Sequence, residues 1–514
     1  MGFFRTLAFA AWAVTAVAAP ALAQDTPKRG GTLTYGMVTE VASLDPHVYS
    51  GSSWKVINHA LYSSLLGFDT SGKIVPALAE KWEVSADAKT YTFTIRSGVT
   101  FHKGQKLTAR DVKYSFDRIL DAATGATLRA NLQGVTVDMV DDHTVRITLA
   151  EPDTGFLNLV ALPEAAIVSE EWMKGNPNVK AEANGTGPFV LAEYEPKVRA
   201  LVKRNPSYFV KDQPRLDQVV FRMISNGDAR VNALRTGATD MIEFVPWKDI
   251  DLLKKLPGIE VQTAGGAFMN IWPNANKPPF NNPKVRQALN YAIDREAISN
   301  AAYFGHGTPL SGPPNAGDTP FFNEDLAKAY TYNPAKAKAL MAEAGFANGF
   351  ETEMVVFQGL TIYTTTAQIL QSNLKDIGIN TKIKLSEWAN VVEAKDKGNY
   401  ELMIWGVSVK LPGPDAYAYY FSSDSTYWAK PIGYVDRDLD RILRQARSTV
   451  DEGQRKTLYR SAEQRIVDTS PWVFINWRDQ AQAYRSKIKG YVQIGGALSE
   501  SSPGIVLPTM WIAN

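Results

Sequence analysis

Cysteine is absent from the 514 residues of this chain, and that absence excludes several kinds of chemistry. Without a thiol the chain has no disulfide framework, no thiolate nucleophile and no cysteine-ligated zinc site. Histidine is scarce as well. The five histidines are His47, His59, His102, His143 and His306. No two of them stand at the spacing of a metal-binding pair, so we expect no metal site and no cofactor.

The chain also has little net charge and few catalytic signatures. Its formal charge is +2 at pH 7, so we expect neither nucleic acid nor an anionic membrane as a partner. It contains no Gly-x-Ser-x-Gly elbow and no phosphate-binding glycine-rich loop. We therefore expect that the protein is not an enzyme. A pair of carboxylates brought together by folding leaves hydrolysis open as an alternative.

Long apolar runs are lacking too, except for residues 7–19. Arg5 precedes this run, and Pro20 and the small-residue site Ala21-Leu22-Ala23 follow it. This order is typical of a secretory signal peptide, and the run is short for a membrane span. We expect cleavage of residues 1–23 before Gln24. Because no cysteine follows to carry a lipid anchor, we expect a periplasmic protein that is not lipid-anchored.

Strand and helix patterns alternate along the rest of the chain. Residues 89–96 and 144–149 alternate apolar and polar side chains, which predicts half-buried strands. Between them, Thr108 and Asp111 predict the capping box of a helix. Residues 217–224 have the strand pattern again. This succession predicts an α/β protein with substantial parallel sheet.

Two further helix starts and the lack of linkers bear on the domain organisation. Asn282-Pro283 and Asn333-Pro334 each predict a helix with proline in its first turn. At roughly 150 residues per domain, the length allows about three domains. No internal repeat and no low-complexity linker separates them. We expect lobes built from interleaved chain segments.

Aromatic side chains are concentrated in the carboxyl-terminal third of the chain. They are Trp388, Trp405, Tyr417, Tyr419, Tyr420, Phe421, Tyr427 and Trp428. Core packing is the usual role of large aromatic residues. A proline- and glycine-rich segment at residues 411–415 lies among them and favours a position at a cleft. Both interpretations, core packing and a ligand pocket, stay open at this point.

The order of several motifs resembles one protein family, the family 5 extracellular solute-binding proteins, which are peptide, nickel and opine receptors of ABC importers. The motifs are residues 44–46 (LDP), 75–85 (VPALAEKWEVS), 91–104 (YTFTIRSGVTFHKG), 109–112 (ARDV), 185–189 (GTGPF), 204–209 (RNPSYF) and 285–295 (VRQALNYAIDR). Each motif alone is weak, whereas their common order over nearly the whole chain is specific.

The resemblance implies an α/β, two-lobe periplasmic-binding-protein fold of class II, large cluster-C type, with an additional subdomain and discontinuous lobes. The implied boundaries are residues 24–57, 185–269 and 481–514 for lobe I, 58–184 for the extra subdomain and 270–480 for lobe II. Crossovers near residues 269–271 and 476–478 are expected to form the hinge. Ligand trapped between the lobes is expected to favour the closed form.

The resemblance also implies a set of ligand-binding positions. In the first lobe they are Tyr49, Ser50, Gly51 and Ser52, in a loop that offers backbone and hydroxyl groups. In the second lobe they are Tyr363 at a helix start, Trp388, Trp405 and Gly406, with Lys410, Asp415 and Tyr417 in the segment that follows. No catalytic residue is among them.

Two of these positions depart from the dipeptide receptors that the chain resembles. Those receptors have an aspartate shortly after the Trp-x-Gly segment and an arginine at the helix start, which hold the two charged ends of a peptide. Here the first segment ends in Lys410 and the helix begins Tyr363-Thr364-Thr365-Thr366. A ligand charge without its buried partner binds poorly. A zwitterionic dipeptide held at both ends is therefore not expected, unless Asp415 supplies the contact to the amine.

The resemblance implies a periplasmic substrate-binding protein that captures a peptide or similar polar organic solute. Its partners would be that solute and the permease subunits of an ABC importer, and we expect a monomer. A receptor for an opine, an oligosaccharide or an aromatic solute is the main alternative. A periplasmic hydrolase and a peptide-binding chaperone are further alternatives. Nickel is not expected, because no histidine follows His306 to bind the metal.

Overall fold

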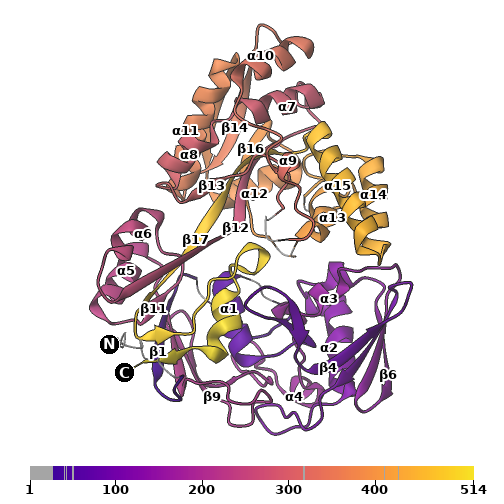
Figure 1. Ribbon diagram of the computed structural model, residues 1–514, viewed down its shortest axis with the longest axis vertical. Coiled ribbons are helices and arrows are strands. Elements are labelled where there is room, and N and C mark those ends of the chain that lie inside the picture. Colours follow the sequence, from indigo (N-terminus) through magenta and orange to yellow (C-terminus); the bar gives the residue numbers. More distant parts are fainter. Residues whose placement is uncertain are drawn as a thin grey trace, which may run out of the picture.

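The computed structural model describes residues 27–39, 41, 43–48, 51–315, 319–409, 411, 413–425 and 428–513. The predicted signal peptide and its cleavage site lie outside these residues. Within them, no helix combines the length and the apolar character needed to cross a membrane. The chain forms an upper and a lower lobe that are joined by two long strands (Figure 1).

The helices are α1 (Ser52–Leu61), α2 (Ala109–Leu120), α3 (Phe156–Leu159), α4 (Glu170–Gly175), α5 (Gly227–Thr236), α6 (Trp247–Lys254), α7 (Pro283–Ala292), α8 (Arg295–Ala302), α9 (Glu324–Ala327), α10 (Pro334–Glu343), α11 (Thr361–Asp376), α12 (Trp388–Lys397), α13 (Ala416–Phe421), α14 (Arg437–Ser448), α15 (Glu452–Thr469) and α16 (Ser502–Val506). Short 3-10 turns are η1 (Ala122–Thr124), η2 (Arg129–Leu132), η3 (Pro163–Ala165), η4 (Gly413–Asp415), η5 (Gly496–Leu498) and η6 (Leu507–Thr509).

The strands are β1 (Thr32–Met37), β2 (Leu66–Phe68), β3 (Ile74–Pro76), β4 (Ala79–Val84), β5 (Thr90–Ile95), β6 (Thr136–Asp141), β7 (Thr144–Thr148), β8 (Phe189–Glu195), β9 (Arg199–Arg204), β10 (Gln218–Met223), β11 (Met241–Ile242), β12 (Ile259–Pro273), β13 (Gly307–Pro309), β14 (Phe350–Phe357), β15 (Ile379–Ser386), β16 (Leu402–Val407), β17 (Val473–Arg485), β18 (Ile488–Lys489) and β19 (Trp511–Ile512).

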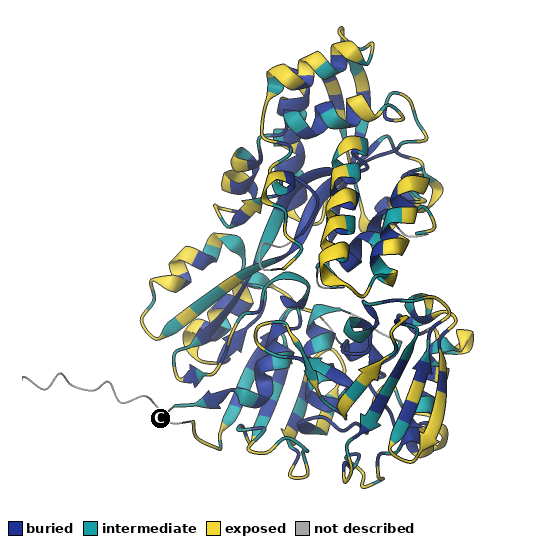
Figure 2. Cartoon of the chain, turned by 45° about the vertical axis from the view of Figure 1, so that its right-hand side comes forward, coloured by how far each residue is buried: buried dark blue, intermediate teal, exposed yellow. Residues whose placement is uncertain are grey.

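One large sheet runs through both lobes in the order β15-β14-β16-β12-β17-β11-β1-β10-β9-β8, with β13 beside β17. It is mixed. Strand β14 pairs in parallel with β15 and β16, and β1 pairs in parallel with β10 and β11. The other pairs are antiparallel, including the pair that joins the lobes. Each lobe therefore contains parallel strands, and the sheet strands are largely buried while the outer helices expose one face (Figure 2).

The predicted strands at residues 89–96 and 144–149 are β5 and β7, but they do not belong to a parallel sheet. They pair antiparallel in a separate sheet of order β4-β5-β7-β6. After helix α2 the chain enters β6 and then turns back into β7. Because of this turn, β7 runs antiparallel to β6 and also to β5. This small sheet and α2–α4 form the lower right part of the molecule (Figure 1). We call this part the small-sheet subdomain.

The predicted helix starts are all present. Asp111 accepts a hydrogen bond from the Thr108 amide at 3.0 Å, which closes the capping box of α2. The side chain of Asn282 caps α7 and that of Asn333 caps α10, each followed by proline. The sequence around each helix start therefore predicts where the helix begins. It does not predict where the helix packs in the fold, because that depends on contacts with residues far along the chain.

Strands β12 and β17 connect the lobes, and they contain the two predicted crossover segments. They pair antiparallel from Ile259 opposite Arg485 to Ile271 opposite Val473. The ladder has register shifts between Ala264 and Ala267 and between Met269 and Asn270. The link between the lobes is therefore a two-stranded ribbon with two irregular points.

Candidate functional site

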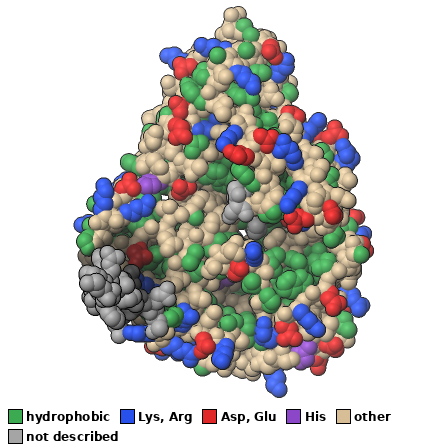
Figure 3. All heavy atoms as spheres, viewed as in Figure 1, with side chains coloured by type: hydrophobic (Ala, Val, Ile, Leu, Met, Phe, Trp, Pro, Cys, Tyr) green, Lys and Arg blue, Asp and Glu red, His purple; other side chains and the backbone are tan. Residues whose placement is uncertain are grey.

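A cavity of about 320 Å³ lies between the lobes, and both of them contribute to its wall. The residues that line it are Gly51, Ser52, Lys55, Thr127, Leu128, Leu162, Glu164, Ser408, Val409 and Glu500. In the space-filling view the surface is hollowed between the lobes (Figure 3). The volume is at the lower end of the range for small-molecule sites.

Larger hollows lie elsewhere in the described part of the molecule. One of about 760 Å³ runs along β14, β15 and α11 on the outer side of the upper lobe. One of about 430 Å³ lies between the starts of α7 and α14 and the end of α15 in the upper lobe. One of about 400 Å³ lies between α1, α16, β2 and β3 in the lower lobe. None of the three has walls from both lobes. Only a site shared by the lobes changes its contacts when they move, so we take the smaller cavity as the candidate site.

The carboxylate of Glu500 joins the two sides of this cavity. Its Oε1 accepts a hydrogen bond from Ser408 Oγ, which follows β16 in the upper lobe, at 2.9 Å. Its Oε2 lies 3.8 Å from Lys55 Nζ on α1 in the lower lobe. Gln480 Nε2 on β17 donates to Oε1 at 3.4 Å. One acidic side chain therefore contacts both lobes and one of the connecting strands.

The start of helix α1 forms the lower wall. Gly51 is its N-cap and Ser52 its first residue, and both line the cavity. Beneath them, Ser53 donates its hydroxyl to the carboxylate of Glu243, which also accepts from the Val38 amide at 2.7 Å. Burial raises the pKa of Glu243. The amides of the first helical turn together with Lys55 favour a negatively charged group on the ligand side of this wall.

Trp388 and Trp405 form part of an aromatic column in the upper lobe. Trp405 on β16 stacks on Trp272 with ring centroids 4.8 Å apart and planes 20° apart. Trp388, at the start of α12, covers the other side of Trp405 at 5.0 Å. Trp405 is 2% exposed and Trp388 is 42% exposed. The column therefore begins in the core and ends at the surface.

Tyr363 and Gly406 lie together on the opposite face of the sheet. The position that a Cβ atom would take at Gly406 is 2.6 Å from the Tyr363 hydroxyl and 3.4 Å from Nη1 of Arg478. Burial raises the pKa of Tyr363, while the charge of Arg478 and the Gly406 amide oppose that rise. Because Gly406 has no side chain, the Tyr363 hydroxyl and the Arg478 guanidinium can both lie close to its backbone.

Asp415 and Tyr417 lie in the interior of the upper lobe. Asp415 accepts from the Tyr459 hydroxyl and lies 3.4 Å from Arg455 Nη2, and burial raises its pKa. The hydroxyl of Tyr417 donates to Glu463 at 2.8 Å. Both are buried. Of the two interpretations of the aromatic cluster, core packing describes Trp405, Tyr417, Tyr420, Phe421 and Trp428, all of which are buried.

A family model described as bacterial extracellular solute-binding proteins, family 5 Middle, matches residues 73–428. The chain belongs to this family. Family 5 proteins are two-lobe binders of small solutes, and this fold is the one that the sequence motifs predicted.

Individual family 5 relatives cover nearly the whole chain. The chain is 29% identical over 465 residues to the glutathione-binding protein GsiB of Shigella flexneri, which covers 87% of this chain and 89% of the relative. It is similar in structure to the binding protein AgaA of A. tumefaciens in complex with agropinic acid, with a TM-score of 0.83, 33% identity and coverage of 94% and 99%. The binding protein DppA of Helicobacter pylori in complex with the peptide STSA has a TM-score of 0.81, 27% identity and coverage of 95% and 99%.

The family 5 resemblance named some positions that come together and others that do not. Gly51 and Ser52 line the cavity, and Gly406 lies two residues before Ser408, which also lines it. Tyr363 contacts Gly406, whereas Trp405, Asp415 and Tyr417 pack inside the upper lobe. Tyr49, Ser50 and Lys410 lie outside the described residues.

Sequence reasoning missed eight of the ten cavity residues and one neighbour. The missed cavity residues include Lys55, Glu164, Ser408 and Glu500, and Arg478 lies beside Gly406. The strand at residues 473–485 carried a signal for Arg478, because the apolar residues 473–475 are followed by polar side chains at 476, 478 and 480. Among the described residues, no group of three or more acidic or histidine side chains is arranged to hold a metal ion.

Proposed function

We propose that this family 5 protein captures a small peptide, or a polar organic solute of similar size, between its lobes in the periplasm and delivers it to the permease of an ABC importer. The observation that carries this proposal is the cavity with walls from both lobes. Because Ser408 of the upper lobe and Lys55 of the lower lobe meet at Glu500, a ligand there contacts both lobes in the closed form. Ligand binding then favours the closed form, and the permease recognises that form.

The cavity size and its polarity support a small, polar cargo. About 320 Å³ is enough for a small solute and too little for a long extended peptide. The relatives are consistent with such a range: one is named for glutathione, one holds an opine and one holds a peptide of sequence STSA. We further propose that the lobe boundaries are those implied by the motifs, with the signal peptide removed before Gln24 and the mature protein a monomer without catalytic activity.

Thermal unfolding with a solute panel tests the proposal. The panel holds di- and tripeptides, glutathione, opines and oligosaccharides, each at several concentrations. A bound solute stabilises the folded protein by RT ln(1 + [L]/Kd), about 2.7 kcal/mol at a hundredfold excess over Kd. We expect at least one peptide or opine to raise the melting temperature in this logarithmic way. The same samples are examined by mass spectrometry for hydrolysis.

A matched pair of variants tests whether the solute that raises the melting temperature binds in the cavity. Ser52→Tyr puts a ring into the cavity, and Ser461→Tyr puts the same ring on the exposed face of α15. The first variant should lose the ligand-induced shift and the second should keep it. The proposal is wrong if no solute shifts the melting temperature while a probe is turned over, and the site is wrong if both variants bind like the wild type.

A further inference from the structure

Strand β17 carries three polar side chains on one face close to the cavity. These side chains are Asn476, Arg478 and Gln480. They occupy every second position of β17, which places them on the same face of the strand. Each has a buried atom without a hydrogen-bond partner in the described part of the chain: Asn476 Oδ1, Arg478 Nε and Gln480 Oε1. Buried polar atoms without partners are costly and uncommon. Arg478 Nε is the donor among these atoms, and an acceptor group of a bound molecule would supply the partner that it lacks.

Small residues and two phenol hydroxyls surround Arg478. Its neighbours in register are Ala267 on β12 and Gly307 on β13, which are both small. Gly406 on β16 adds bare backbone beside its guanidinium. The hydroxyl of Tyr303, which is buried, has no partner among the described residues and lies in the field of the Arg478 charge. The Tyr363 hydroxyl, which lies beside Gly406, is also in the field of the Arg478 charge.

The charge of Arg478 is not balanced by a side chain of the described protein. No ion pair joins it to an acidic residue there, whereas Glu500 is engaged by Lys55. The next residue, Asp479, points to the other face of β17, where a Cβ at Gly265 would lie 3.4 Å from its Oδ1. Arginine stays protonated in proteins. A partly buried guanidinium without a counter-charge is unfavourable, and an anionic ligand relieves this cost.

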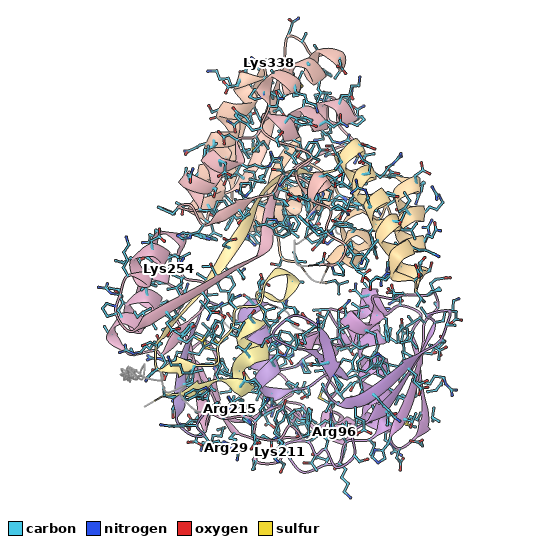
Figure 4. All side chains as sticks on the ribbon, viewed as in Figure 1. Arg29, Arg96, Lys211, Arg215, Lys254 and Lys338 are labelled. Carbon is cyan, nitrogen blue, oxygen red and sulfur yellow. The ribbon has the colours of Figure 1, made fainter. Side chains whose placement is uncertain are left out.

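Lys55 is a second cation at the cavity, and it is engaged by Glu500. The basic side chains labelled in Figure 4 follow the outer surface of both lobes and not the space between them. They are Arg29, Arg96, Lys211, Arg215, Lys254 and Lys338. Arg478 by contrast is connected to the cavity, because Gln480 on its face of β17 donates to Glu500 and Ser408 follows Gly406 by two residues. Arg478 therefore stands on a connecting strand two positions from Gln480, whose partner Glu500 lines the cavity.

We propose that Arg478 binds a carboxylate of the transported solute, with the hydroxyls of Tyr303 and Tyr363 as additional donors. This inference rests on the proposed function and narrows its cargo to organic anions, among them peptides and opines with a free carboxylate. The planar guanidinium holds a carboxylate through two parallel hydrogen bonds, which fixes its orientation. In the dipeptide receptors an arginine at the start of the helix that corresponds to α11 binds the carboxylate. This chain lacks that arginine, and Arg478 on β17 binds the carboxylate in its place.

The experiment compares acids with their amides on the wild type and on three variants. The probes are glutathione, N-acetyl-Ala-Phe, whose amine is blocked, and the carboxamide of each, measured by isothermal titration calorimetry. We expect the acids to bind the wild type and the amides to bind at least about 30-fold more weakly. Arg478→Met should bind the acids more weakly than the wild type by a similar factor. In this variant the acid and its amide should bind with equal affinity. Arg478→Lys should recover part of the affinity, and Arg441→Met on the exposed face of α14 should bind like the wild type.

A second measurement needs no ligand and separates a binding role from a structural one. Because the guanidinium has no protein counter-charge, ligand-free Arg478→Met should melt at or above the wild-type temperature. A clearly lower melting temperature for this variant would assign Arg478 to the architecture and overturn the inference, as would equal binding of acids by the variant and the wild type. If no probe binds the wild type, the proposal of a peptide receptor fails, and the ligand-free melting temperatures still decide the role of Arg478.

Discussion

Trp388 and Trp405 are the same residue type in two environments 5.0 Å apart. Trp405 is enclosed between Trp272 and Trp388, and its ring has almost no contact with water. Trp388 packs against Phe357 at 5.3 Å on one side and is exposed on the other. The inner ring therefore supports the upper lobe, while the outer ring is partly exposed to solvent.

Replacing each tryptophan by alanine should separate these roles. Trp405→Ala leaves a large hole in a packed core and should lower the free energy of unfolding by about 3–5 kcal/mol. Trp388→Ala should cost about 1 kcal/mol, because much of its surface is already in water. Urea denaturation measures both. An equal loss of stability in the two variants would contradict this division of the column.

The candidate residues show what sequence could predict at this scale. Residue type and motif position placed Gly51, Ser52 and Gly406 at or next to the cavity. They did not place Asp415 and Tyr417, because the partners that bury them, Tyr459 and Glu463, come from a helix more than forty residues later. Glu500 was missed for the same reason, since it meets Ser408 across 92 residues. Such contacts depend on the whole fold.

At the level of elements, the segment between β7 and α3 makes a second contact between the lobes. The Thr154 amide donates to the carbonyl oxygen of Arg447, at the end of α14, at 2.9 Å. Asp153 pairs with the guanidinium of the same arginine, with Nε 3.2 Å from Oδ1. A Cβ at Gly155 would stand 3.1 Å from Oδ2 of Asp415. This contact joins the small-sheet subdomain to the upper lobe, away from β12 and β17.

Asp153→Asn should weaken this contact and favour the open form. Because the Arg447 side chain is 38% exposed, solvent screens the pair, and we expect an effect of about 1 kcal/mol. That corresponds to a roughly fivefold loss of affinity for any solute that requires closure, with a larger radius of gyration in X-ray scattering. Asp117→Asn, in an exposed pair with Lys113, is the control. Unchanged affinity and scattering for Asp153→Asn would show that this contact does not hold the lobes together.

Elements were predicted well where the signal was local and less well where it was not. The capping box of α2 and the Asn-Pro starts of α7 and α10 are complete within a few residues, and all three are present. The alternation in β5 and β7 predicted strands correctly but contained no information on their direction. That direction depends on β6 and its turn into β7, which no motif marked.

At the level of the whole molecule, one buried and two half-buried histidines make the lower half sensitive to acid. Burial lowers the pKa of His47, His59 and His102 from 6.5 to about 4, and the charge of Arg118 acts on His47 in the same direction. His47 Nε2 lies 2.9 Å from the Ala166 carbonyl oxygen and His102 Nε2 lies 3.1 Å from that of Gly187. All three are neutral in the folded protein at neutral pH.

Stability should therefore fall as the pH is lowered from about 6.5 toward 4. In that window the unfolded chain binds more protons than the folded one, so each histidine contributes a loss of up to about 1.4 kcal/mol per pH unit. Urea denaturation at pH 7.5, 6.0 and 5.0 measures the slope. Glu243 and Asp415 act in the opposite direction, because burial raises their pKa.

A variant isolates one histidine from these opposing groups. His102→Gln should show a smaller loss of stability between pH 7.5 and 5.0 than the wild type, by about the contribution of one histidine. His143→Gln, in an exposed turn between β6 and β7, should follow the wild type. A His102→Gln profile parallel to that of the wild type would show that protonation of this residue does not drive the loss.

The two-lobe architecture was predictable from the order of motifs, but its physical basis is not local. The central strands of the lower lobe come from residues near both ends and from the middle of the chain, as β1 pairs with β10 and β11, and β11 with β17. Composition and periodicity do not contain such pairings. They also did not show that the connecting strands carry Arg478 into the region between the lobes.

The two ends of the described chain lie on the same lobe. Strands β1 and β19 approach so closely that a Cβ at Gly31 would be 2.9 Å from Ile512 Cδ1, and both ends lie at the lower left of Figure 1. Fluorescent labels attached to both ends would travel together, and energy transfer between them would stay constant while the lobes open and close. A reporter of solute capture therefore needs its second label on the upper lobe, for example at the exposed Tyr332.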